Sequence, residues 1–142
     1  MRATKSTHWI AALLLWAPLM ASAATDPECL KHLGGALSGA ECFIGLSNDL
    51  KANNKEVVEK IIATIPKGNK NRTVLQNYMR AQASANQYCE LARQSATVWI
   101  DEKRGPKAMY NQPDVIYLQC IYDNLEHQNK FLKDVLKNAL EQ

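Results

Sequence analysis

The chain has 142 residues, of which 46% are apolar and 22% are charged, and its formal net charge is +3. This length suits one domain, and the mixture is that of an ordinary globular protein, which argues against disorder, collagen and a multipass membrane protein. Part of the charge comes from Arg2 and Lys5, which lie in a segment that we expect to be removed.

Residues 1–23 have the features of a secretory signal peptide. A positively charged start is followed at 9–20 by an apolar stretch too short to span a bilayer, and then at 21–23 by the small side chains of a cleavage site. We therefore expect a leader at 1–23 and a single helical domain at 24–142, located in the periplasm or secreted. The alternative is an uncleaved membrane anchor.

Cleavage at this point would leave 15 basic and 14 acidic residues, a net charge of +1. A chain so close to neutral lacks the basic surface that binds nucleic acid, and it has no concentrated basic patch for a membrane. We therefore expect neither nucleic acid nor, after cleavage, a membrane as a partner.

All four cysteines lie after the leader: Cys29, Cys42, Cys89 and Cys120. An even number in an exported chain favours two disulfides. The alternative, a metal site, is disfavoured because Cys29 and His32 have ligand spacing but no second pair of ligands, and the haem motif C-x-x-C-H is absent. We expect no metal and no other cofactor.

Apolar residues after the leader recur three or four positions apart, so the sequence predicts an all-α fold, a small disulfide-stapled bundle of about four helices. Its first stretch, residues 29–39, is a short helix or turn. A bridge between Cys29 and Cys42 requires a reversal of the chain, because a straight helix would place them ~20 Å apart. Three glycines allow this reversal: Gly34, Gly35 and Gly39.

The next helix is expected from about Ala40 to Ile65, where Pro66-Lys67-Gly68 ends it. Three polar residues near its middle suggest a break or an internal cap: Ser47, Asn53 and Asn54. The last helix is expected from Pro113 to about Leu140, with an apolar face that one glutamine, Gln128, interrupts.

A third helix is expected to start near Thr73. If it ran straight on to the following loop, Cys89 would lie ~18 Å before its end, whereas Cys120 lies only ~10 Å after the start of the last helix. A bridge between these cysteines therefore predicts that the third helix ends or bends near Ser95, with Trp99 in or near the connection. The pairings 29–42 and 89–120 are favoured, and two others remain open: 29–89 with 42–120, and 29–120 with 42–89.

No motif in the sequence is typical of an enzyme. The nucleophile motif G-x-S-x-G, the metal motif H-E-x-x-H and a phosphate-binding glycine loop are all absent, and paired cysteines offer no thiolate. We therefore do not expect an enzyme. Aromatic residues near a helix–loop junction can anchor a protein contact, with core packing as the alternative, and four are candidates: Trp99, Tyr110, Tyr117 and Tyr122.

Residues 42–136 resemble the LprI-like lysozyme inhibitors, a family of small exported bacterial proteins. The similarity includes the helix that ends at Cys89, the segment Tyr117-Leu118-Gln119-Cys120 that opens the last helix, and the spacing of Leu125 and Leu132. Cys42 followed by Asn48-Asp49-Leu50 and Asn53 is similar to the family's first helix. The resemblance implies an exported helical protein with paired cysteines that binds and blocks a muramidase.

Two other functions compete with this interpretation: an immunity protein that neutralises a secreted toxin, and a structural or stress-related periplasmic protein. An inhibitor would bind a cell-wall hydrolase and an immunity protein would bind a toxin, so the partner is a protein in both cases. The loop from Arg104 to Pro113, which contains Tyr110, is the predicted contact.

Overall fold

The computed structural model describes residues 24–99 and 110–141, so the expected leader lies outside the described residues. The described part is helical and contains no strand, which confirms the predicted all-α bundle. Its elements in chain order are the 3₁₀ turn η1 (Pro27–Lys31), α1 (Ala36–Thr64), α2 (Asn71–Ala85), the 3₁₀ turn η2 (Asn86–Tyr88), α3 (Cys89–Ala96) and α4 (Gln112–Leu140).

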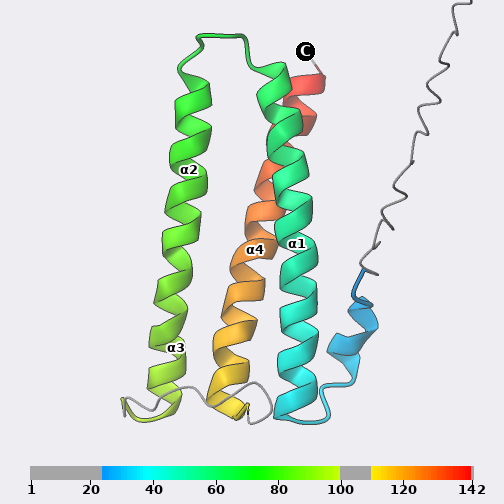
Figure 1. Cartoon of the computed structure of the whole chain (residues 1–142), viewed down its shortest axis with the longest axis vertical. Helices are drawn as coiled ribbons and strands as arrows, with labels where there is room; N and C mark the ends of the chain where they lie inside the picture. The colour runs from blue at the N-terminus through cyan, green and yellow to red at the C-terminus, as the bar shows by residue number, and fades with distance from the viewer. Residues whose placement is uncertain (1–23, 100–109, 142) are drawn as a thin grey trace, which may run out of the picture.

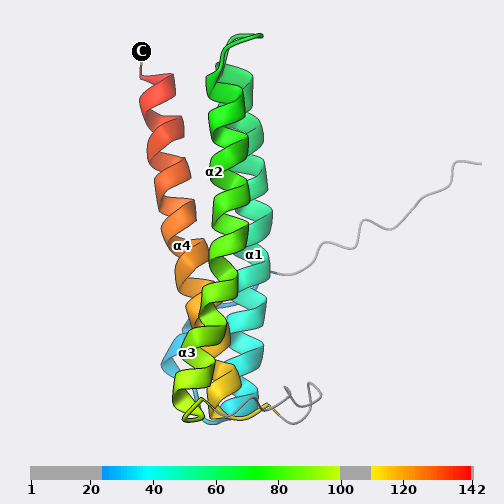
Figure 2. The ribbon, with the colours of Figure 1, turned by 90° about the vertical axis from the view of Figure 1, so that its left-hand side faces the viewer.

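The described helices form three rods, because α2, η2 and α3 follow one another along one line (Figure 1). α1 and α4 have 29 residues each, about 44 Å, and they run in the same direction. The α2–α3 rod runs the opposite way (Figures 1 and 2). α4 packs most extensively against α1 and next against α3. No helix in the described ranges is long and apolar enough to cross a membrane.

α1 starts at Ala36, four residues before the predicted start, and ends one residue before the predicted end. The chain then turns through Gly68, whose φ of +80° lies in the left-handed region that favours glycine. The guanidinium of Arg72 donates to the carbonyls of Ile62 and Ile65 at 3.0 and 2.7 Å. Arg72 thus supplies additional donors to carbonyl groups at the end of α1, where the helix offers too few backbone N–H groups.

The predicted break in the middle of α1 is wrong, because the helix is continuous through Ser47, Asn53 and Asn54. Ser47 and Asn54 are buried, and the Asn54 side chain forms its hydrogen bonds with α4. A polar side chain that finds partners on a neighbouring helix does not compete for the backbone of its own helix. The polar residues at this point therefore mark a contact between helices and not a cap.

The disulfides join Cys29 to Cys42 and Cys89 to Cys120, which confirms the favoured pairing. The Cα atoms are 5.8 and 5.6 Å apart, within the usual range for a disulfide. The second bridge is within reach because α3 ends at Ala96, close to the predicted end. Four α-helices in three rods thus match the predicted size of the bundle.

Two glycines in α1 allow other segments to approach closely. Gly45 faces Thr25, whose backbone N–H donates to Oδ2 of Asp49 at 2.5 Å, and a Cβ on Gly45 would overlap the Thr25 side chain. Gly39 was expected in the chain reversal, but it lies buried inside α1. A Cβ on Gly39 would lie 3.3 Å from Val115 of α4, so Gly39 serves helix packing.

The hydrophobic core forms three clusters along the bundle, and α4 contributes to all of them. The upper cluster joins α1, α2 and α4, the lower cluster joins α1 and α4, and the third joins α3 and α4. Their buried members are, in that order, Val57, Ile61, Leu75 and Leu132; Ala40, Phe43 and Val115; and Cys89, Ile121 and Leu125. The apolar face predicted for the last helix is therefore the centre of the core.

Candidate functional site

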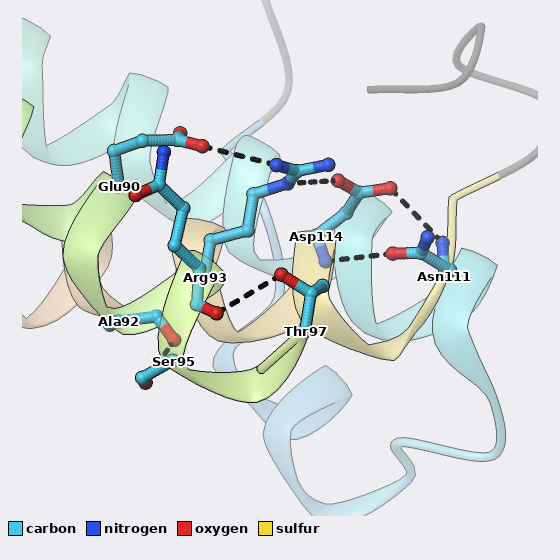
Figure 3. Close-up of polar contacts among 8 residues, drawn as sticks. Glu90, Ala92, Arg93, Ser95, Thr97, Asn111 and Asp114 are labelled. Carbon is cyan, nitrogen blue, oxygen red and sulfur yellow. Dashed lines mark hydrogen bonds and ion pairs between the residues drawn. The ribbon is translucent and has the colours of Figure 1, made fainter. Parts of the chain in front are cut away.

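Arg93 and Asp114 form a buried ion pair where the end of α3 meets the start of α4 (Figure 3). Nε of Arg93 donates to Oδ1 of Asp114 at 3.0 Å, and Nη1 donates to Oε1 of Glu90 at 3.1 Å. The Arg93 and Asp114 side chains are 2% and 1% exposed. The hydrogen bond to Asp114 is the largest cause that raises the pKa of Arg93, so the guanidinium stays charged.

Asp114 also caps the start of α4. Its backbone N–H donates to Oδ1 of Asn111 at 3.1 Å, and the backbone N–H of Asn111 donates to Oδ2 of Asp114 at 3.2 Å. This reciprocal arrangement is a capping box. Both carboxylate oxygens are thus engaged, so Asp114 holds the end of α3 against the start of α4, and it is not placed as a general base.

α3 ends with a pair of hydrogen bonds of the Schellman type. The backbone N–H of Trp99 donates to the carbonyl of Gln94 at 2.8 Å, and that of Val98 donates to the carbonyl of Ser95 at 3.4 Å. Val98 and Trp99 have φ angles of +53° and +63°, in the left-handed region that glycine usually occupies here. For a β-branched residue this conformation is strained, and such strain is concentrated at functional sites.

Large apolar side chains are exposed around this end of the bundle, on η2, on α3 and on its C-terminal cap. We call them the α3 patch: Tyr88, Leu91, Val98 and Trp99, which are 66%, 54%, 79% and 66% exposed. Tyr88 and Leu91 are three positions apart and are neighbours on the helix surface. The segment that carries the patch is held to α4 by the Cys89–Cys120 bridge and the Arg93–Asp114 pair.

The four aromatic residues predicted as contacts do not share one surface. Trp99 is exposed in the α3 patch, whereas Tyr110 and Tyr122 pack against the lower cluster and Tyr117 packs against the α3–α4 cluster. The rings of Tyr122 and Phe43 have centroids 5.8 Å apart. Burial is the main cause that raises the pKa of Tyr122, followed by the charge of a nearby carboxylate. These three tyrosines therefore have a place in the core, and Trp99 does not.

The predicted contact loop is only partly described. Residues 104–109 lie outside the described residues, and the structure resumes at Tyr110, which is half-buried. The contact role of the loop therefore stays a prediction.

A groove lies between α1 and the α2–α3 rod, with α4 at its base, and we call it the α1–α2 groove. Its central section has a volume of about 310 Å³. This section shares Val58 and Met79 with an upper section, and it shares Lys51 and Asn86 with a lower section. The three sections thus form one continuous depression along the bundle.

A network of amides joins α1 to α4, and two of its members, Asn54 and Gln128, line the groove; three of its members are buried, and Asn53 is half-buried. Nδ2 of Asn54 donates to Oε1 of Gln128 at 3.0 Å and to the carbonyl of Leu125 at 3.3 Å. Nδ2 of Asn129 donates to Oδ1 of Asn53 and to Oδ1 of Asn54, both at 2.6 Å. We call these residues the amide network. Their mutual hydrogen bonds satisfy groups that would otherwise be costly to bury.

The amide network and the Arg93–Asp114 pair are not among the features predicted from the sequence. Gln128 interrupts the apolar face of α4 between Leu125 and Leu132. Asn54 likewise lies on the apolar face of α1, before Val57. Two amides that each sit on an apolar stripe are a signal for a buried hydrogen bond between helices. No comparable signal marked Arg93.

Among the described residues, no group of three or more His, Cys, Asp or Glu side chains is placed to hold a metal ion. The exposed apolar side chains of the α3 patch form a surface of the kind that binds other molecules. Searches of family models, curated proteins and solved structures found no match to this chain.

Proposed function

We propose that this chain is an exported binding protein that docks on a muramidase and blocks its substrate cleft. The observation that carries the docking is the α3 patch, where four large apolar side chains face solvent on a segment tied to α4. The partner class comes from the resemblance to LprI-like lysozyme inhibitors, and the export comes from the leader at 1–23.

The patch has the composition and rigidity of a binding hot spot. Trp and Tyr are enriched among the residues that dominate interface energies, and the patch contains Trp99 and Tyr88. The backbone of Trp99 is fixed by its hydrogen bond to Gln94, and the Cys89–Cys120 bridge holds the helix beneath it. Little ordering is then needed on association, which favours affinity.

The net charge of the domain predicts how fast it associates with its partner. Muramidases are often basic, and a domain of net charge +1 provides no long-range attraction to a basic partner. We therefore expect association at the rate of an unsteered pair, about 10⁵–10⁶ M⁻¹s⁻¹, with little dependence on salt.

The test is inhibition of cell-wall lysis by a purified muramidase. The double variant Leu91→Ala/Trp99→Ala is expected to raise the half-inhibitory concentration by about 30-fold, since truncation of a hot spot costs at least about 2 kcal/mol. The matched control is Val74→Ala/Leu140→Ala, which shortens two side chains that are 57% and 69% exposed elsewhere. This control is expected to inhibit like the unmodified protein.

Two results would contradict the proposal. The absence of inhibition by the unmodified protein at large molar excess over several muramidases would reject this class of partner. Equal inhibition by the Leu91/Trp99 variant and by its control would reject the α3 patch as the contact.

A further inference from the structure

The α1–α2 groove exists because the backbones of α1 and α2 approach each other closely at few points, and their side chains meet in the upper cluster. α1 and α2 make few contacts with each other, although both lie beside α4 (Figures 1 and 2). Antiparallel neighbours in a bundle usually bury their facing apolar sides against each other. Here part of the facing sides is buried in the upper cluster, and the rest forms the walls of the groove.

Apolar side chains of the walls and the base line every section of the groove. Val58, Met79 and Leu125 line the central section, Leu75 lies in the upper section and Ile121 in the lower section. An apolar surface of this length has the character of a recognition site.

The charges along the groove have one sign. Lys51 and Lys55 line it from α1, and Arg80 lines it from α2. None of the described residues that line the three sections is acidic. Lys51 and Lys55 take part in no ion pair among the described residues. In a domain with almost equal numbers of acidic and basic residues, this separation of charge favours an anionic ligand.

Among the described residues, two side-chain NH2 groups at the base of the groove donate to a sulfur atom. Nδ2 of Asn124 lies 3.4 Å from Sγ of Cys89, and Nε2 of Gln128 lies 3.4 Å from Sδ of Met79. Sulfur is a weak acceptor, so the exchange of either contact for an oxygen acceptor of a ligand would be favourable. The donors and the lysines thus select the same kind of ligand, one that carries carboxylate or other oxygen acceptors.

We propose that the α1–α2 groove binds an amphipathic helix of a partner protein, whose apolar stripe is flanked by Asp and Glu residues. The stripe contacts the apolar side chains that line the groove, and the acidic side chains face Lys51, Lys55 and Arg80. The bound helix is the fourth rod of the bundle. This site is separate from the α3 patch and does not depend on the function proposed above.

The distribution of charge favours a helix over a lipid. An acyl chain has its anionic group at one end, whereas the cations lie on both walls and are spread along the groove. An acyl chain would also cover the amides of Asn124 and Gln128 without offering them an acceptor. The groove extends along α1 from Ile44 to Ile62, about 27 Å, which matches a helix of about 18 residues. Binding of a helix in such a groove uses apolar anchors at i, i+3, i+4 and i+7.

The probes are two synthetic 18-residue peptides with the same leucine stripe, one flanked by Glu and the other by Lys. Fluorescence anisotropy of labelled peptide measures their affinity for the full-length protein. We expect the Glu peptide to bind at least about tenfold more tightly, since several exposed charge pairs contribute. The difference should shrink as salt is added, because the cations are exposed.

The decisive variant is Lys51→Glu/Lys55→Glu, which is expected to weaken binding of the Glu peptide about tenfold and to strengthen binding of the Lys peptide. The matched control is Lys130→Glu/Lys133→Glu, which makes the same change of charge on another exposed face of the bundle and is expected to leave both affinities unchanged. Circular dichroism verifies that both variants keep the helical content of the unmodified protein. Leu91→Ala/Trp99→Ala should bind the Glu peptide normally, which separates this site from the α3 patch.

Several outcomes would overturn the proposal. Equal affinity for the two peptides would show that the groove does not distinguish ligands by their charge. Equal weakening by the decisive variant and its control would show the same. Phosphatidylglycerol vesicles that bind more tightly than the Glu peptide, and that lose binding in the Lys51/Lys55 variant, would assign the groove to a lipid. A dimer in sedimentation equilibrium that this variant abolishes would assign the groove to a second copy of the chain.

Discussion

Val98 has a φ of +53° at a position after a helix where glycine is usual. A side chain with a branched Cβ is strained there by about 1–2 kcal/mol. Val98 is also the most exposed large apolar residue of the α3 patch, at 79%, so it gains little from packing. Strain without compensating burial is expected where a side chain serves a contact with another molecule.

At the residue scale, Val98→Gly is expected to stabilise the protein by about 1 kcal/mol, because the relief of strain exceeds the entropy that a glycine loses on folding. The control is Val74→Gly, which removes another exposed valine from a helical position in α2 and is expected to destabilise by about 1 kcal/mol. Urea denaturation measures both changes. A destabilised Val98→Gly would show that the backbone at this cap is not strained.

At the scale of elements, the two halves of the α2–α3 rod are held very differently. α3 is joined to α4 by a disulfide, by the Arg93–Asp114 pair and by extensive packing. α2 makes few contacts with α4, and only Leu75 of its side chains is buried. The 3₁₀ turn η2 separates the two halves. Opening of the bundle should therefore start in α2, which is the wall of the groove.

The two disulfides should stabilise different parts of the bundle. Cys89→Ala/Cys120→Ala opens a loop of 31 positions, which costs about 4 kcal/mol, and it should raise hydrogen exchange throughout α3 and the start of α4. Cys29→Ala/Cys42→Ala opens a loop of 13 positions, costs about 3 kcal/mol, and should raise exchange only in η1 and the first turns of α1. Hydrogen exchange followed by mass spectrometry distinguishes them. Identical exchange patterns in the two variants would contradict this division.

At the scale of the whole molecule, the amide network sets how α1 and α4 lie along each other. The two helices are parallel, and apolar stripes alone allow them to slide by one turn with similar burial. The hydrogen bonds of Asn54 with Gln128, and of Asn129 with Asn53 and Asn54, are satisfied only in the observed register. A single buried polar contact is known to fix register in helical assemblies in this way.

The single variant Asn54→Leu is expected to destabilise by about 2–3 kcal/mol, because it leaves Oε1 of Gln128 buried without its donor and removes one of the two acceptors of Asn129. The triple variant Asn54→Leu/Gln128→Leu/Asn129→Leu should recover most of that loss, but with broadened NMR resonances at the α1–α4 contact as the register becomes less defined. Chemical denaturation and heteronuclear NMR measure these effects.

The control for this pair is Asn48→Leu, which replaces an exposed amide of α1 and should change stability by less than about 0.5 kcal/mol. If the triple variant were as unstable as Asn54→Leu and kept sharp resonances, the network would be a source of stability and not of register.

Much of this architecture could be predicted locally. The spacing of apolar residues predicted the helices, Pro66-Lys67-Gly68 marked the end of α1, and the reach of a disulfide placed the end of α3 near Ser95. The Cys29–Cys42 and Cys89–Cys120 pairing was favoured by the sequence, which left two other pairings open, and the structure confirms it. These features depend on the chain within one helix or one turn, where spacing alone determines geometry.

What the sequence determined by itself is therefore the helical class and the ends of the helices, whereas the structure selected one of three possible cysteine pairings. Only the tertiary structure decided that Arg93 pairs with Asp114 and that Asn54 pairs with Gln128, which is 74 positions away. It also decided that α1 and α2 stand apart and leave the α1–α2 groove open. The physical reason is that a polar residue on an apolar stripe has the same neighbours in sequence whether it breaks its helix or is buried against another helix. Which of the two occurs depends on the distant groups that the packing of the rods brings within hydrogen-bonding distance.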